Sequence, residues 1–468
     1  MVTSVVIHDA VVGGVPADLR ISGDRIVAVG SDLARSDADV TMDAHGGEVI
    51  PGLHDHHIHL LALAAARRSV AVGPIDVGDA DGLQQRLRRA ASEAAPGEWV
   101  RAIGYHHSVA GDLDRWRLDA MVGARPVRVQ HRSGALWILS SAALASLPPG
   151  DLTGLAGVER DGAGEPTGRL WRLDAWLADR VPGSPADLGP VGEALLRFGV
   201  TGVTDATPTE ERSMIDEIAS AAMAGQLPQR IAVTGGARLV LRLVAGIEIG
   251  PVKVLLPDHE PPDLDAISAA VRSARHQGRP VAVHCVTAET AAVAVSAIEE
   301  VGPVDGDRIE HGAVLSVGLA RRIGELGITV VTNPSFVAER GDQYLSDVDP
   351  VELPDLWPCR SLLDAGVAVG GGTDAPFGDP NPWRAIAAAI DRRTATGRVL
   401  GADERIEPRR ALDLFLGPLG RPGAAPRRVE VGALADLCVL PAPVDVCLAE
   451  PASVVPQATI VRGKVRRW

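Results

Sequence analysis

The sequence predicts an α/β fold: a (β/α)8 TIM barrel, with a small β-sandwich domain formed by both termini and a capping insertion after the first barrel strand. Three observations support this prediction. Short apolar strand patterns alternate with helical patterns through most of the 468 residues. Strand-like segments at the two ends are too few to bury a core alone. One long interval, residues 64–196, interrupts the alternation.

The terminal strands define the predicted sandwich. We expect residues 1–48 to form its N-terminal half and residues 428–468 its C-terminal half, on either side of a barrel over residues 49–427. The expected strands are Ser4–Ile7, Ala17–Ser22, Arg25–Val29, Ala435–Leu440 and Thr459–Val465.

The barrel prediction rests on repeated strand–helix units. The expected strands are Val49–Leu53, Val200–Asp205, Arg230–Thr234, Val252–Leu256, Pro280–His284, Arg308–His311, Thr329–Thr332 and Val367–Gly370. The expected helices are Met214–Ala224, Leu264–Gln277, Ala288–Val301, Leu319–Leu326, Pro358–Ala365 and Pro382–Thr396.

The insertion over residues 64–196 follows the first barrel strand. Its pattern predicts helices near Leu83–Ala94 and Ser140–Leu147, strands near Trp99–Gly104 and Pro126–His131, and a connector rich in Gly and Pro over Pro148–Gly168. Loops that follow barrel strands emerge at the face where barrel active sites lie. We therefore expect the insertion to cap the site and to line its pocket.

Composition narrows the possible functions. A formal net charge of −14 argues against a nucleic-acid partner. No apolar run reaches the ~20 residues of a membrane span, and no secretory pattern opens the chain. Only four cysteines in so long a chain predict reduced thiols and a cytoplasmic location, and the lack of a CxxC pair argues against a structural zinc knuckle. We expect a small-molecule substrate and a homodimer or other homo-oligomer.

The segment Pro51–Leu60 carries the strongest local signal. Its strand pattern ends in His57 and His59, and side chains two apart in a strand share a face. Neutral imidazole is a common ligand of zinc-like ions. This pair therefore predicts half of a metal site.

Lysine usage supplies a second signal, because Lys253 and Lys464 are the only lysines among 46 basic residues. Lys253 lies in an apolar strand pattern, where a buried charge would be costly without a task. An amine can deprotonate and react, whereas a guanidinium stays charged. The alternative is a lysine on an edge strand that faces water.

The remaining predicted ligands also stand at strand ends. The set, in chain order, is His57, His59, Lys253, His284, His311 and Asp374. Because barrel strands run parallel, their carboxyl ends converge on one rim. By contrast, His8, His45, His131 and His276 show no such placement, and we expect them to be structural or surface residues.

Together these motifs resemble the metal-dependent amidohydrolase superfamily, specifically amidohydrolase family 3, over essentially the whole chain. The matching pieces are Pro51–His59, Gly199–Val203, Val252–Val254, Val283–His284, Arg308–His311, Ser361–Val367 and Thr373–Pro376, together with the tail segments Val431–Leu437 and Val461–Val465. In length the chain is nearer to the phenylurea and molinate herbicide hydrolases of this family than to its N-substituted formamide deformylases.

The resemblance implies a binuclear metal centre. His57 and His59 would hold one divalent ion and His284 and His311 the other. Lys253 would react with CO2 to form a bridging carbamate, and Asp374 would ligate metal beside the reactive water. Zinc is the expected metal, with Co, Mn or Fe as alternatives. Attack by metal-bound hydroxide would then cleave the substrate, with Asp374 and Lys253 as the catalytic residues.

The chain departs from the family pattern at Gly134-Ala135, at Ser140, at Pro257–His259 and at Asn333-Pro334. These departures fall where substrate contacts are expected. The expected substrate-binding residues are Tyr105, His106, Trp137, His259 and Asn333, with the first three in a mostly apolar wall supplied by the insertion.

The reaction that this reasoning favours is hydrolysis of a C–N bond in a small amide, urea, carbamate or thiocarbamate. The first alternative keeps the metal site but acts on N-acyl amino acids or deaminates a ring. A carboxylate-bearing substrate would then need an arginine such as Arg132, Arg169 or Arg172. The remote alternative is a catalytically inactive scaffold of the same fold, which would have lost its ligands.

Overall fold

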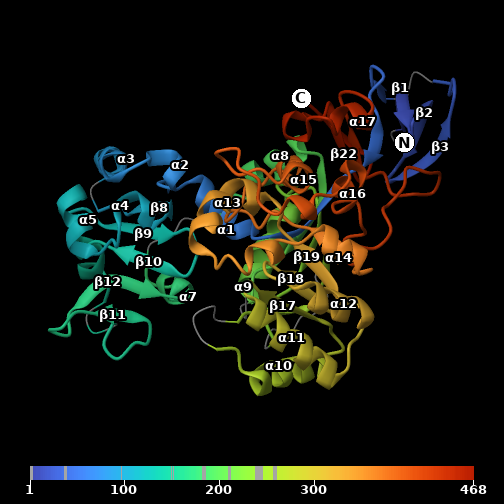
Figure 1. Ribbon diagram of the computed structural model, residues 1–468. Helices are drawn as coiled ribbons and strands as arrows, with labels where there is room; N and C mark the ends of the chain where they lie inside the picture. Colours follow the sequence, from blue (N-terminus) through green and yellow to red (C-terminus); the bar gives the residue numbers. More distant parts are fainter. Residues whose placement is uncertain are drawn as a thin grey trace. The chain divides into compact units, whose positions relative to one another are not determined.

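The computed structural model describes residues 4–35, 40–95, 97–148, 150, 152–181, 186–208, 212–237, 246–256 and 261–468 (Figure 1). The chain divides into two compact units. The larger unit comprises Met1–Leu61 and Leu188–Trp468, and the smaller unit comprises Ala62–Asp187. Within the described ranges, no helix is both long enough and apolar enough to cross a membrane.

Parallel strands form the centre of the larger unit. One sheet has the order β15-β14-β13-β6 and another the order β16-β17-β18-β19-β20, with every neighbouring pair parallel. Their bounds are β6 (Leu53–Ile58), β13 (Val200–Asp205), β14 (Arg230–Val233), β15 (Ile247–Ile249), β16 (Val252–Val254), β17 (Val281–Cys285), β18 (Arg308–His311), β19 (Thr329–Thr332) and β20 (Val369–Gly371). The strands are almost wholly buried, as parallel strands covered by helices are.

Helices follow most of these strands in the sequence. They are α8 (Gly189–Arg197), α9 (Arg212–Met223), α10 (Leu264–His276), α11 (Ala288–Val301), α12 (Val317–Glu325), α13 (Ser335–Asp347), α14 (Arg360–Asp364), α15 (Pro382–Asp391), α16 (Pro408–Asp413) and α17 (Val444–Cys447), with short 3-10 turns at Leu353–Asp355, Ala402–Glu404 and Pro451–Ser453. α10 begins at Asp263, whose side chain accepts a hydrogen bond from the Ala266 amide at 3.2 Å.

The first barrel strand differs from the prediction over Val49–Leu53. The structure has β5 (Val49–Pro51), which pairs with the C-terminal strand β21, and then β6, which pairs with β13. The two strands separate at Gly52. This position has no room for a side chain, because an added Cβ would lie 2.1 Å from the Thr201 side chain. The polar stretch after Leu53 remains a strand because Asp55 and His57 find hydrogen-bond partners inside the fold.

Several helices of the larger unit also differ from the prediction. The predicted helix Pro382–Thr396 ends at Asp391, because Arg392 adopts a left-handed φ of 54°. The Arg392 side chain is fully buried and donates hydrogen bonds to the carbonyls of Leu356, Trp357 and Leu400. The prediction also lacks α8, α13, α16 and α17.

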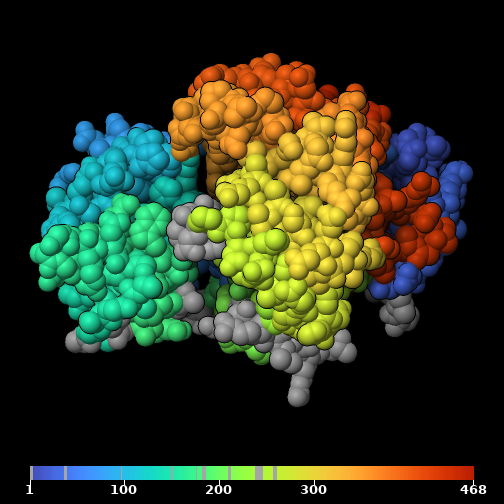
Figure 2. Space-filling view, turned by 60° about the horizontal axis from the view of Figure 1, so that its bottom comes forward, coloured from blue at the N-terminus to red at the C-terminus, as the bar shows by residue number. Residues whose placement is uncertain are grey.

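The terminal segments form two further sheets with a shared core. β1 (Ser4–Val12), β2 (Val15–Ser22), β3 (Arg25–Gly30) and β4 (Val40–Asp43) form one sheet, and β5, β21 (Leu437–Val439), β22 (Ala458–Val461) and β23 (Lys464–Arg467) form the other. The predicted single strand Thr459–Val465 is instead a hairpin that turns at Gly463. Ile7, Ile21, Leu437 and Ile460 belong to one buried cluster. Both views show the first strands beside the C-terminal segment (Figures 1 and 2).

The smaller unit contains a six-stranded sheet with the order β11-β12-β10-β9-β8-β7. Its strands are β7 (Val70–Ala71), β8 (Val100–Tyr105), β9 (Val127–His131), β10 (Leu136–Leu139), β11 (Val158–Arg160) and β12 (Pro166–Trp171). Its helices are α1 (Leu60–Arg67), α2 (Pro74–Val77), α3 (Ala80–Glu93), α4 (His107–Ala110), α5 (Arg115–Val122), α6 (Ser141–Ala145) and α7 (Asp174–Ala178), and α1 begins within the larger unit. The predicted connector over Pro148–Gly168 contains β11 and the start of β12, which pair antiparallel.

Candidate metal centre

Most of the predicted ligands gather where the parallel strands of the larger unit end. Donor atoms of His57, His311 and Asp374 lie within 4.8 Å of one another. His59 joins them, because its Nε2 atom lies 3.2 Å from Asp374 Oδ1. The His284 ring centroid lies 4.6 Å from that of His311. We call these five residues and the neighbouring Lys253 the strand-end cluster.

A carboxylate orients His57. Its Nδ1 atom donates to Glu310, which also forms an ion pair with Arg308 at 2.5 Å. Burial opposes ionisation of Glu310, but the charges of Arg308 and Lys253 hold the pKa of its carboxyl below the ordinary value. A proton fixed on Nδ1 leaves the Nε2 lone pair of His57 facing the cluster.

An amide orients His311 in the same way. The Asn333 side-chain nitrogen donates to the Gly372 carbonyl at 2.9 Å, so its oxygen faces His311 Nδ1 at 2.8 Å. Because that oxygen can only accept, Nδ1 of His311 carries the proton and Nε2 has the free lone pair. Burial and the nearby His284 lower the pKa of His311 to about 3, which keeps the ring neutral.

The backbone holds two cluster residues in an uncommon conformation. His311 has a φ of 69° and Asp374 a φ of 55°, which are left-handed values that side-chain-bearing residues rarely adopt. The Asp374 amide donates to the His57 carbonyl at 2.7 Å. Backbone strain of this kind concentrates at functional sites.

Three buried polar atoms in the cluster lack hydrogen-bond partners among the described residues. They are His57 Nε2, Lys253 Nζ and Asp374 Oδ1. A buried polar group left unpaired costs about 1–3 kcal/mol, so their convergence needs an explanation. A divalent cation supplies one, because imidazole and carboxylate are the ligands that zinc-like ions take. The donor set therefore fits a metal ion.

Charge in the cluster also suits a cation. Burial by itself would raise the pKa of Asp374, but the nearby side chains of His59, His311 and His57 together lower it below the ordinary value. Lys253 is 5% exposed, which excludes a lysine facing water at an edge strand. Burial lowers the pKa of its ammonium, and the nearby Glu310 partly offsets this.

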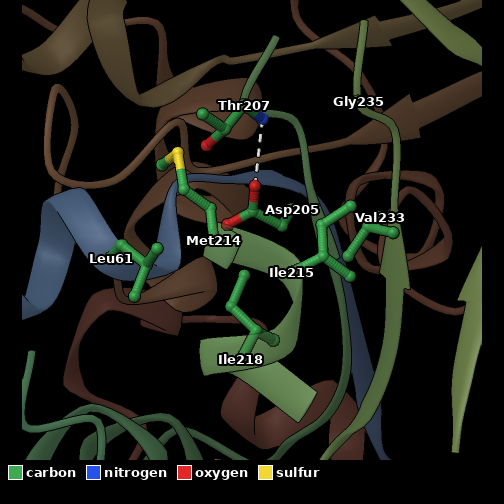
Figure 3. A pocket seen from close by; sticks show the side chains of 8 residues that line it. All are labelled: Leu61, Asp205, Thr207, Met214, Ile215, Ile218, Val233 and Gly235. Atoms are coloured by element: carbon green, nitrogen blue, oxygen red, sulfur yellow. Dashed lines mark hydrogen bonds between the residues drawn. The ribbon is translucent and has the colours of Figure 1, made fainter. Parts of the chain in front are cut away.

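Asp205 and Thr207 complete the surroundings of His59. His59 Nδ1 lies 3.0 Å from the Thr207 hydroxyl. The Asp205 carboxylate accepts from the Thr207 amide at 3.0 Å and from the Leu60 amide at 2.8 Å, which ties the end of β6 to the end of β13 (Figure 3). A narrow pocket beside this contact is lined mainly by apolar side chains, among them Met214 and Ile218.

Sequence reasoning missed the residues that orient the ligands. Asp205 had a usable signal, because it is the last residue of a predicted barrel strand. Asp55, which accepts hydrogen bonds from the Thr373 and His57 amides, lies two residues before the predicted ligand His57. The contact of Glu310 with His57 could not be predicted from the sequence, because the two residues are 253 positions apart.

Two of the predicted substrate-binding residues are buried in cores of the smaller unit. Tyr105 is 2% exposed and donates its hydroxyl to the Gly111 carbonyl. Trp137 is 4% exposed and its indole nitrogen donates to Asp174 at 2.7 Å. His106 lies at the start of α4, close to His107 and His131. The side chains of Tyr105 and Trp137 therefore have roles in packing the smaller unit.

The other predicted substrate-binding residues are in the larger unit. Asn333 is fully buried, and both ends of its amide are engaged by His311 and Gly372. The structure thus gives it an orienting contact where a substrate contact was expected. His259 lies outside the described residues. Arg169, one of the arginines considered for a carboxylate, pairs with Glu159 at 3.0 Å in the smaller unit.

Comparisons with known proteins agree with this geometry. A family model described as Amidohydrolase family matches residues 40–467. An N-substituted formamide deformylase from Arthrobacter pascens is 28% identical over 519 aligned positions, which cover 95% of this chain and 94% of that protein.

Solved structures give the same picture of the fold. An uncharacterized metal-dependent hydrolase from Pyrococcus horikoshii OT3 has a TM-score of 0.69 at 18% identity, over 90% of this chain and 95% of that one. An atrazine chlorohydrolase from Arthrobacter aurescens TC1, complexed with zinc, has a TM-score of 0.56 at 16% identity, over 98% and 94%. These likenesses show a TIM-barrel-type α/β fold.

Proposed function

This chain belongs to the amidohydrolase family, and on that premise we propose that it hydrolyses a carbon–nitrogen bond, other than a peptide bond, in a small molecule. The substrate class is an amide, urea, carbamate or thiocarbamate. The observation that carries the proposal is the convergence of His57 Nε2, Lys253 Nζ and Asp374 Oδ1, all buried and unpaired among the described residues. Similarity to an N-substituted formamide deformylase over 95% of the chain supports the choice of bond.

The strand-end cluster would hold two divalent ions. His57 and His59 would hold one ion and His284 and His311 the other, and zinc is the first candidate. When bound, the ions lower the pKa of water and polarise the scissile carbonyl. The contacts of His57 with Glu310 and of His311 with Asn333 keep both Nε2 lone pairs directed at the cluster.

Asp374 is the proposed acid–base group. Its Oδ1 atom lies 3.3 Å from His57 Nε2 and 3.2 Å from His59 Nε2, so it stands among the proposed ligands. Its lowered pKa keeps the carboxylate ionised, which is the form that can accept a proton from the attacking water. The same oxygen then delivers the proton to the leaving nitrogen, which departs as a neutral amine.

Lys253 is the proposed bridging residue. Its neutral amine adds to the carbon of CO2, an N–C bond forms, and a proton leaves to give a carbamate anion. Its buried position near Glu310 and Asp374 supports this role, because a charged ammonium there lacks a hydrogen-bond partner among the described residues. An arginine could not form the carbamate.

One finer feature of the fold belongs to the proposal. The parallel sheets close into one barrel, which two seams support: the Asp374 amide donates to the His57 carbonyl at 2.7 Å, and the Lys253 amide donates to the Gly235 carbonyl at 2.8 Å.

The test is a screen of amides, formamides, ureas, carbamates, N-acyl amino acids and aminated rings against metal-loaded protein, with the Asp374→Asn variant as the matched control. We expect release of an alkyl or aryl amine from the wild type only. Ammonia released from a ring would favour a deaminase, and turnover confined to N-acyl amino acids would favour a deacylase. No turnover of any compound by fully metallated protein would favour an inactive scaffold.

A further inference from the structure

The smaller unit contains a separate group of three histidines. We propose that His106, His107 and His131 bind one divalent cation of the zinc class, at a site distinct from the strand-end cluster. Donor atoms of these three side chains lie within 4.8 Å of one another. All three belong to the smaller unit, so the site depends only on the packing within that unit.

Strand register brings the three residues to one edge of the sheet. β8 and β9 are parallel neighbours, and Tyr105 at the end of β8 lies opposite His131 at the end of β9. His106 and His107 follow Tyr105 directly. A register shift before Tyr105, next to the left-handed Gly104 (φ 82°), sets this alignment. His131 therefore stands at a strand end, where the predicted strand Pro126–His131 also ends, although we expected a structural or surface histidine there.

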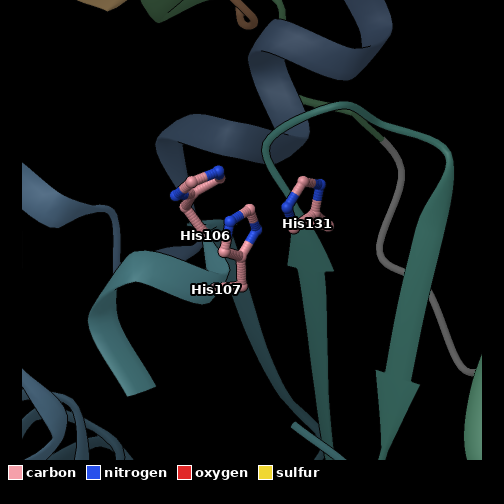
Figure 4. A group of neighbouring side chains, drawn as sticks. All are labelled: His106, His107 and His131. Carbon is pink, nitrogen blue, oxygen red and sulfur yellow. The ribbon is translucent and has the colours of Figure 1, made fainter. Parts of the chain in front are cut away.

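The rings lie close together above these strand ends (Figure 4). The ring centroids of His106 and His107 are 3.9 Å apart, and those of His106 and His131 are 5.5 Å apart. His107 and His131 are parallel within 3° at 6.5 Å. Rotation of the side chains can bring three ring nitrogens onto one ion, whose bonds to imidazole are about 2.0–2.1 Å long.

Two of the histidines are oriented by the same local device. His106 is followed two residues later by Ser108, and His131 by Ser133. In both pairs Nδ1 accepts a hydrogen bond from the serine amide at 3.2 Å and lies 2.8 Å from the serine hydroxyl. These contacts fix the orientation of each ring. Binding of a metal ion through Nε2 would require the proton of the neutral ring to move to Nδ1, which can then donate to the serine hydroxyl.

The nature of the side chains selects the ion. The group contains three imidazoles and no carboxylate or thiolate among the described residues. Imidazole prefers zinc, copper, nickel and cobalt to magnesium or calcium. Three protein ligands leave a further coordination position for water. His106 is buried, His131 is partly buried and His107 is exposed, so an ion can reach the site from solvent.

The test counts zinc on the full-length holoenzyme. Protein is dialysed to equilibrium against graded free Zn²⁺, and bound zinc per chain is measured by elemental analysis. We expect the wild type to bind one more ion per chain than His107→Ala or His131→Ala. His45→Ala, which removes a histidine that is 74% exposed in the larger unit, is the matched control and should keep the full count.

A second pair of variants tests the orienting serines. Ser108→Ala and Ser133→Ala should each weaken binding of the additional ion by about 10–100-fold, the usual effect of losing an outer partner. Equal zinc counts in wild type and His107→Ala would overturn the proposal. Because His107 is exposed, that variant does not depend on surviving a change in the core.

Discussion

Asn333 either orients the proposed ligand His311 or contacts the substrate, and the variant Asn333→Ala tests which role it has. The substitution removes two buried hydrogen bonds, to His311 Nδ1 at 2.8 Å and to the Gly372 carbonyl at 2.9 Å. Each group left unpaired costs about 1–3 kcal/mol, so the free energy of unfolding of the metal-free protein should fall by about 2–6 kcal/mol. Without a fixed tautomer on His311, affinity for the metal should fall about 10–100-fold.

The assay is competition for zinc against a chelator of known affinity, together with urea unfolding of the metal-free protein. Thr332→Val is the matched control. Thr332 is the adjacent residue and is equally buried, and its hydroxyl has no hydrogen-bond partner among the described residues. The control should hold zinc as tightly as the wild type. If Asn333→Ala also holds zinc within twofold of wild type and only raises KM, the orienting role is refuted and a substrate contact is favoured.

Four further predictions follow from single residues. Lys253→Arg should lose activity although the charge is kept, and short carboxylic acids should partly restore activity to Lys253→Ala; a fully active Arg variant would rule out the carbamate. Asp374→Asn should lower kcat by at least about 10²–10⁴-fold while part of the metal is retained, and elemental analysis beside kinetics checks both. Arg392→Met should lower the free energy of unfolding by roughly 3 kcal/mol or more, because three buried carbonyls lose their donor; an unchanged urea midpoint would contradict this. Burial raises the pKa of the Glu339 carboxyl to about 7 in the folded protein. Its contribution to the free energy of unfolding is therefore fully present below pH 4.5, the pKa of the unfolded chain, and is lost as pH rises through 7. Glu339→Gln should flatten the dependence of the free energy of unfolding on pH between about pH 5 and 8.

Three barrel strands could be bounded closely from the sequence, because the bounds of β13, β18 and β19 agree with the prediction. β19 has an apolar centre at Val330-Val331, as a buried parallel strand commonly does, whereas β18 is Arg-Ile-Glu-His and is also a piece of the family motif. β6 could not be bounded in this way, because His54–His57 are polar in sequence and yet fully buried in the fold. Their place in a strand depends on partners such as Glu310 and Thr373 that are distant in sequence.

The candidate site was predictable to the extent that it follows the strand-end rule. His57, His311 and Asp374 come together because parallel strands end at one rim, and that rule needs only the order of strands. The orienting contacts of Glu310 and Asn333 depend on side-chain geometry across neighbouring strands. The close approach of His131 to His106 likewise depends on a register shift near Gly104 that the sequence pattern does not reveal.

The two lysines of this chain occupy opposite environments, and this has a practical consequence for handling the protein. Lys253 is buried in β16, whereas Lys464 is exposed in β23. A lysine-directed reagent applied to the folded protein therefore meets one accessible lysine side chain. Lys464 offers an attachment point for a fluorophore or a solid support that leaves the strand-end cluster chemically intact.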